Sequence, residues 1–125
     1  MADQTRIILL AHGSSDQRWC KTFEDLAEPT LKAVPEARVA YMELSQPSLE
    51  DEVAAAAAAG INEIRILPLF LAAGRHLRKD VPEMLDTYRA KYQLDISLMP
   101  PIGNDPRLGF ALRDIARDLL EQDHD

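Results

Sequence analysis

Cysteine is almost absent from this chain, since Cys20 is its one cysteine in 125 residues. A single thiol excludes an internal disulfide, and it excludes zinc and iron–sulfur sites that need several thiolates. The scarcity of cysteine also favours a reducing compartment, so we expect a cytoplasmic protein.

Long hydrophobic runs and an excess of positive charge are also lacking. No stretch approaches the roughly 18 apolar residues of a membrane-spanning helix, so we expect no membrane segment. Residues 1–6 lack the basic start and the long apolar core of a signal peptide. The net charge is −7. Because the phosphates of a nucleic acid would repel such a chain, we expect no nucleic-acid partner.

Hydrophobic residues make up 46% of the chain, enough for one core, and we expect a single domain over residues 1–125. Apolar runs over 7–11, 38–44, 63–71 and 95–99 predict four strands. Helical spacing of apolar residues follows each run. The alternation predicts an α/β fold in which a four-stranded parallel sheet carries helices on both faces.

Breakers and caps indicate where several helices begin and end. Pro35 ends the first helix, Ser48 caps the second with Asp51 three residues later, and Gly60 closes it. Pro106 stands in the first turn of the last helix. We expect that helix to turn its apolar side to the core, and that side consists of Leu108, Leu112, Ile115 and Leu119.

Candidate ligands follow three successive strands. His12 follows the first strand, Glu43 ends the second, and His76 follows the third strand and its loop. Open parallel sheets bind ligands beyond the carboxyl ends of their strands, so these residues should share one edge. Two imidazoles and a carboxylate suit divalent cobalt, iron or nickel, and imidazole also accepts protons near neutral pH. Taken alone, each of these residues is more often an ordinary loop or surface side chain than a ligand.

Basic residues gather at the start of the third predicted helix, namely Arg75, His76, Arg78 and Lys79. Cations are unfavourable at the positive end of a helix dipole, whereas an anionic ligand is favoured there. This cluster therefore indicates an anion site. The alternative is that Asp80 and Glu83 neutralise it as ordinary surface ion pairs.

The residues after His12 support nucleotide binding only weakly, because Gly13, Ser14 and Ser15 have neither the P-loop spacing nor a GxGxxG pattern. Both serines are good caps for the helix that follows. Trp19 is either a cover for a ligand or a packed aromatic. Cys20 has no evident base beside it in the sequence and is more simply an inert helix residue.

Four motifs in order, over nearly the whole chain, resemble the CbiX family of chelatases. Residues 11–14, AHGS, are similar to the GHGS opening of that family, with Ala11 where many relatives have glycine. Residues 41–49 resemble its ELxxPS/T motif, and residues 68–82 resemble its PLFLxxGxHxxxDxP signature. Residues 101–103 are similar to its late P-[LI]-G turn.

The resemblance implies a chelatase-like fold and insertion of cobalt, iron or nickel into sirohydrochlorin, on the way to cobalamin, sirohaem or a nickel tetrapyrrole. It implies no ATP, no organic cofactor and, at this length, a homodimer. The family histidines fall on His12 and His76, so these two and Glu43 would hold the metal. His12 and Glu43 would be catalytic, as the base and its helper. Substrate contacts are expected from Ser45, Leu71, Ala72, Ala73, Gly74, Arg75 and Arg78.

Three other functions stay open. A metal or tetrapyrrole carrier would use the same residues without turnover. A histidine phosphatase also has His-Gly after its first strand, but it carries arginine where this chain has Ala11. A purely structural, flavodoxin-like module is the third. The metal itself is not specified, because histidine and carboxylate ligands accept all three ions.

Overall fold

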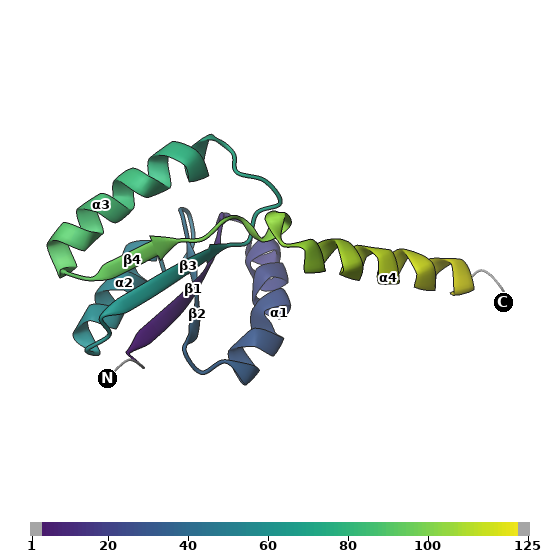
Figure 1. Ribbon diagram of the computed structural model, residues 1–125, viewed down its shortest axis with the longest axis horizontal. Coiled ribbons are helices and arrows are strands. Elements are labelled where there is room, and N and C mark those ends of the chain that lie inside the picture. The colour runs from purple at the N-terminus through teal and green to yellow at the C-terminus, as the bar shows by residue number, and fades with distance from the viewer. Residues whose placement is uncertain (1–3, 123–125) are drawn as a thin grey trace.

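The computed structural model describes residues 4–122, apart from the side chain of His76. Its strands form one parallel sheet in the order β2-β1-β3-β4 (Figure 1). The strands are β1 (Thr5–Ala11), β2 (Ala37–Tyr41), β3 (Glu63–Pro68) and β4 (Asp95–Leu98). The helices are α1 (Gln17–Ala33), α2 (Leu49–Ala58), α3 (Val81–Tyr92) and α4 (Pro106–Gln122). The predicted α/β fold and its parallel sheet are confirmed.

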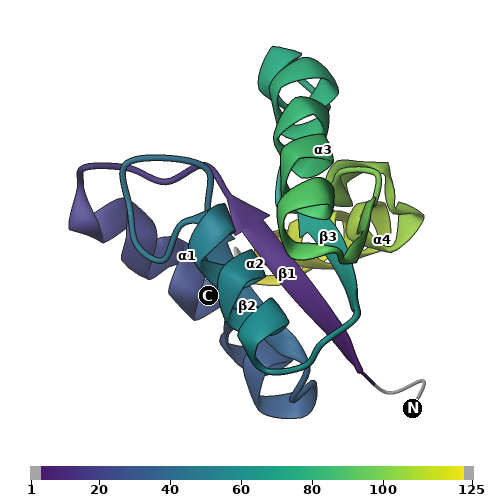
Figure 2. The same ribbon diagram turned by 90° about the vertical axis from the view of Figure 1, so that its left-hand side faces the viewer.

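Alternate side chains of β1 serve the two faces of the sheet. Ile8 and Leu10 are fully buried in the main core, which α2 and α3 complete. Ala11 is buried on the other face, with Cys20 of α1 and Tyr41 of β2. Figure 2 shows α1 and α3 on opposite sides of β1. Helices therefore cover both faces, as predicted.

The caps of α2 match their prediction. The Ser48 hydroxyl accepts from the Asp51 N–H at 3.0 Å, and the Asp51 carboxylate accepts from the Ser48 N–H at 3.1 Å. Gly60 follows with a φ of +84°. The left-handed backbone at this position favours glycine.

The cap of α1 differs from its prediction. Asp16 caps the helix, because its carboxylate accepts from the Arg18 N–H at 2.9 Å. Ser14 instead accepts from the Asp16 N–H at 3.0 Å, so it braces the capping residue. When several polar residues precede a helix, the path of the loop determines which of them caps it.

The last helix contradicts the expectation of a core-facing side. Figure 1 shows α4 extending away from the sheet, and none of its residues is buried. Leu112, Ile115 and Leu119 are 61%, 58% and 56% exposed. Helical periodicity reports that a helix has an apolar side, but not which surface covers it. Along residues 4–122, no helix is long and apolar enough to cross a bilayer.

Candidate functional site

Pairing between β1 and β2 continues beyond the strands and places Glu43 beside His12. The Met42 N–H donates to the Ala11 carbonyl at 2.9 Å, and the Glu43 N–H donates to the His12 carbonyl at 3.2 Å. Both side chains, of His12 and of Glu43, are exposed. The sheet edge thus brings two of the three candidate ligands together on neighbouring loops.

Gly13 allows these two loops to touch. Its φ is +92°, and a Cβ at this position would collide with the carbonyl oxygen of Glu43. A residue with a side chain would therefore strain the backbone and separate the loops. Glycine after His12 is therefore required by the close packing of the two loops, whatever the chemical role of the histidine.

Ser45 links the same two loops through hydrogen bonds to Ser14. Its hydroxyl accepts from the Ser14 N–H at 2.9 Å and donates to the Ser14 carbonyl at 2.7 Å. The Sγ of Cys20 lies 3.1 Å from this hydroxyl. Ser45 therefore positions the loop that carries His12, and its predicted contact with substrate stays a prediction. Cys20 is buried and belongs to this structural cluster.

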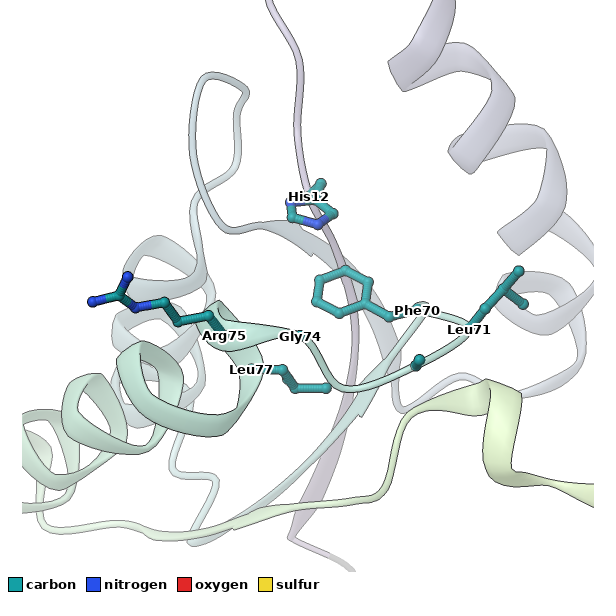
Figure 3. Close-up of a pocket in the computed structure, with 7 residues that line it drawn as sticks. His12, Phe70, Leu71, Gly74, Arg75 and Leu77 are labelled. Carbon is teal, nitrogen blue, oxygen red and sulfur yellow. The ribbon is translucent and has the colours of Figure 1, made fainter.

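An open hollow of about 290 Å³ adjoins His12. The imidazole stacks on Phe70, with ring centroids 4.5 Å apart and ring planes 21° from parallel. Figure 3 shows this pair at the hollow, with the Arg75 guanidinium pointing away from Phe70. The lining consists of His12, Phe70, Leu71, Ala72, Gly74, Arg75 and Leu77. A largely apolar hollow thus lies beside an exposed imidazole.

Four of the seven predicted substrate residues line the hollow; Ala73, Arg78 and Ser45 do not, and neither does Glu43, which is predicted as a metal ligand. Leu71, Ala72, Gly74 and Arg75 line the hollow, and Ala73 is exposed in the same loop. Arg78 is exposed on the turn that follows. Glu43 and Ser45 are not among the lining residues and lie on the β2 side of His12.

The third candidate ligand, His76, begins a single π-helical turn (His76–Asp80) that leads directly into α3. Turns of this kind often occur at functional sites. The side chain of His76 lies outside the described part of the structure, so its approach to His12 stays a prediction. Among the side chains that are described, no three from His, Cys, Asp and Glu form a metal-holding group.

The basic cluster on this turn is exposed at Arg75, Arg78 and Lys79. None of the ion pairs found among the described side chains involves these three cations. Because the His76 side chain lies outside the described part of the structure, neutralisation of the cluster by Asp80 and Glu83 stays an alternative prediction. Binding of an anionic ligand by these cations likewise stays a prediction.

The family profile described as CbiX matches residues 6–119. This chain belongs to the CbiX family. A crystal structure of the CbiX protein from Marinobacter aquaeolei VT8 is similar with 52% identity and a TM-score of 0.92, over 97% of this chain and 98% of that one. The predicted family and its chelatase fold are confirmed.

Curated relatives of this CbiX protein share its length. Sirohydrochlorin cobaltochelatase from Sulfurisphaera tokodaii is 27% identical over 114 residues, which are 91% of this chain and 92% of the relative. The sirohydrochlorin chelatase SirB from Bacillus subtilis subspecies spizizenii, solved with cobalt, is 26% identical with a TM-score of 0.79. That match covers 91% of this chain and 50% of SirB, so half of SirB lies outside it.

Phe70 and Leu77 also line the hollow, and neither is among the residues predicted from the sequence. Both lie within the third family motif, which was the available signal. Neither residue is ionisable, and the stacking of Phe70 on His12 joins loops that follow different strands. Trp19, by contrast, is 63% exposed and is not a packed aromatic. It lines a separate hollow with Arg18 and Thr22.

Proposed function

We propose that this CbiX-family protein inserts a divalent metal ion into sirohydrochlorin, without ATP and without an organic cofactor. The observation that carries the proposal is the stacked His12–Phe70 pair beside an apolar hollow at the carboxyl edge of the sheet. Relatives of the same length are sirohydrochlorin cobaltochelatases. The metal ion is a substrate here, and cobalt, iron and nickel all suit the predicted donors.

His12 and His76 are the proposed metal ligands, with Glu43 as a third ligand or as a partner that orients His12. The 3.2 Å backbone hydrogen bond between Glu43 and His12 supports their joint use. His76 directly follows Gly74 and Arg75, which line the hollow beside His12. This arrangement supports delivery of the ion at one side of the hollow.

The macrocycle is proposed to lie across the hollow rather than inside it. At about 290 Å³ the hollow is at the small end of ligand pockets, which span roughly 300–1,000 Å³. Phe70 and the loop 71–74 offer an apolar surface to the flat ring. Arg75 and Arg78, with Lys79 beside them, would pair with the carboxylates of sirohydrochlorin through charge-assisted hydrogen bonds. Ala73 and Ser45 are proposed to complete the contacts.

Insertion of the ion releases the pyrrole N–H protons of the ring. We assign His12 as the base that accepts these two protons one at a time, once its ring nitrogen no longer holds the ion, and passes each to water before it takes the next. Glu43 is assigned as the carboxylate that stabilises the imidazolium. Exposure of both side chains gives the protons a path to solvent. The nitrogen lone pairs then bind the metal.

An absorbance assay of the purified protein with sirohydrochlorin tests this function, with cobalt, ferrous iron and nickel supplied separately. Many equivalents of metallated product per subunit, at a rate well above the uncatalysed one, are expected. Tight binding without acceleration would instead favour a metal or tetrapyrrole carrier. Neither binding nor acceleration would contradict both functions.

Two further expectations stay predictions. A homodimer is implied by the length of the chain within its family. A cytoplasmic location fits the single cysteine and a role in tetrapyrrole biosynthesis.

A further inference from the structure

Two residues other than glycine have left-handed backbone within residues 4–122. They are Leu44, with a φ of +65°, and Gln93, with a φ of +56°. In this conformation the Cβ crowds a backbone carbonyl, so glycine and asparagine adopt it at a lower cost than leucine does. A bulky residue with such a backbone therefore needs a specific reason.

Gln93 has this backbone because it ends a helix. It directly follows α3, and its N–H donates to the Arg89 carbonyl at 2.9 Å. Left-handed residues commonly end helices in this way, because the turn satisfies a carbonyl that lacks a partner in the last turn. Secondary structure thus explains Gln93, whereas Leu44 follows a strand and ends no helix.

The backbone of Leu44 is set by its two neighbours in the chain. The Glu43 N–H donates to the His12 carbonyl at 3.2 Å. The Ser45 hydroxyl bonds both the N–H and the carbonyl of Ser14. Because both neighbours are hydrogen-bonded to the loop that carries His12, the path of the chain between them is fixed, and it passes through left-handed backbone.

These contacts explain the backbone of Leu44 but not its side chain. Leu44 is 71% exposed, so its apolar side chain gains little from burial. Asparagine or glycine would follow the same path at a lower steric cost. Strained backbone that the surroundings enforce is concentrated at active sites and ligand-binding sites. An exposed leucine next to Glu43 therefore points to a ligand that covers it.

The order of the strands places Leu44 and the hollow on opposite sides of His12. The hollow is lined by the loop after β3, and Leu44 lies in the loop after β2. His12 follows β1, which lies between β2 and β3 in the sheet. A macrocycle of four rings that lies across a hollow of about 290 Å³ extends beyond it, and the loop after β2 is the surface on the far side of His12.

We propose that Leu44 is a substrate-binding residue whose side chain packs against the sirohydrochlorin ring. The inference rests on the proposed function, because it takes this tetrapyrrole as the ligand. In this arrangement the ring spans the loops after β2 and β3, with His12 between them. Apolar contacts on both sides of His12 then hold the pyrrole nitrogens close to the imidazole.

Three variants of the full chain test this contact. Leu44→Asn removes the apolar side chain and suits left-handed backbone. Gln93→Asn makes a matched change at the opposite edge of the sheet, just before β4. Leu44→Met keeps an apolar side chain of similar volume.

An absorbance titration with sirohydrochlorin, without metal, measures the dissociation constant of each variant. We expect Leu44→Asn to raise it about tenfold, because apolar contact with the ring is lost. Leu44→Met should raise it less than ~3-fold and Gln93→Asn less than ~2-fold. Unchanged binding by Leu44→Asn, or equal weakening by Leu44→Met, would overturn the proposal.

Thermal unfolding of the same variants separates a ligand contact from a structural role. Leu44→Asn and Gln93→Asn should both melt at or above the wild-type temperature, because asparagine relieves the strain of left-handed backbone. A Leu44→Asn variant that is as stable as wild type but binds the ring more weakly supports the contact. Weaker binding together with a melting temperature lowered by more than ~4 °C would show that Leu44 supports the loop, and it would overturn the proposal.

Steady-state insertion of cobalt distinguishes failure of this proposal from failure of the proposed function. Leu44→Asn should raise the KM for sirohydrochlorin and leave the KM for cobalt within ~2-fold, because leucine offers the metal no ligand. An active wild type with an unaffected Leu44→Asn variant would overturn the contact alone. A wild type that needs Leu44 to bind sirohydrochlorin but accelerates no insertion would contradict the proposed reaction alone.

Discussion

Neighbouring residues position both the loop and the ring of His12. Gly13 lets its loop touch the backbone of Glu43, and Ser45 bonds both the N–H and the carbonyl of Ser14. Phe70 stacks on the imidazole itself. Neighbours that fix an exposed imidazole lower the cost of orienting it during reaction.

Replacement of His12 by alanine should therefore remove the reaction and spare the fold. We expect His12→Ala to reduce metal insertion at least ~100-fold, because it removes both the proposed base and a metal ligand. The melting temperature should change by less than ~4 °C, since the side chain is exposed. Gln17→Ala, on the exposed first turn of α1, is the control and should retain full activity. A fully active His12→Ala variant would contradict the assignment.

Tyr41 lies behind the same loop and links stability to high pH. Burial, with a smaller effect of Glu24, raises its pKa from 10.0 to about 12. The folded state thus keeps the phenol proton after the unfolded chain has lost it. The resulting stability is fully present below pH 10.0 and is lost as the pH rises towards about 12.

Urea unfolding across this pH range measures that loss. Tyr41→Phe keeps the ring and removes the titrating hydroxyl, so its free energy of unfolding should fall less steeply. Burial also raises the pKa of Tyr88, and the difference between the two proteins cancels this background. Identical pH slopes for the wild type and the variant would contradict the assignment to Tyr41.

The loop between β3 and α3 is the element on which both surfaces depend. It lines the hollow beside His12 and, through Leu71, an apolar groove of about 320 Å³ that Leu9, Leu26 and Leu67 also line. The Gly103 N–H holds its beginning by donating to the Phe70 carbonyl. Gly103 approaches this backbone so closely that there is no room for a Cβ.

Two glycine-to-alanine variants test this close contact. One removes the glycine at the contact, Gly103, and the other, at Gly109 in α4, measures the effect of helix propensity alone. We expect Gly103→Ala to lower the free energy of unfolding by about 1–3 kcal/mol, because backbone cannot yield as a flexible side chain can. Gly109→Ala, inside α4 with open space around it, should raise it by up to about 1 kcal/mol. Denaturant titration measures both. A Gly103→Ala variant as stable as wild type would contradict the close contact.

The whole molecule leaves apolar surface uncovered on α4 and on the groove in a single copy. If a second copy covers both, folding is linked to protein concentration. The melting temperature of the full chain should then rise as the protein is concentrated. Calorimetry over about a hundredfold concentration range measures this. Ile115→Asp, on the apolar side of α4, should abolish the dependence, and Phe110→Asp, on the opposite side of the helix, should keep it. A constant melting temperature for wild type would contradict dimerisation.

Patterns over a few neighbouring residues were enough to predict the strands, several helix ends and the edge of the sheet where the candidate ligands lie. The period of the apolar residues predicted the parallel sheet, and Ser48, Gly60 and Pro35 marked helix ends, because caps and breakers act over a few residues. The position of His12 and Glu43 after successive strands placed them at one edge, since all parallel strands end there. The four sequence motifs predicted the family of the chain.

Only the tertiary structure decided what depends on contacts between distant segments. Phe70 meets His12 and Ser45 meets Ser14 because separate strands end side by side. The apolar side of α4 was plain from its sequence, but its direction follows from the contacts of Gly103 with the loop after β3. An amphipathic pattern requires a covering surface, and only the arrangement of the whole chain determines which surface that is.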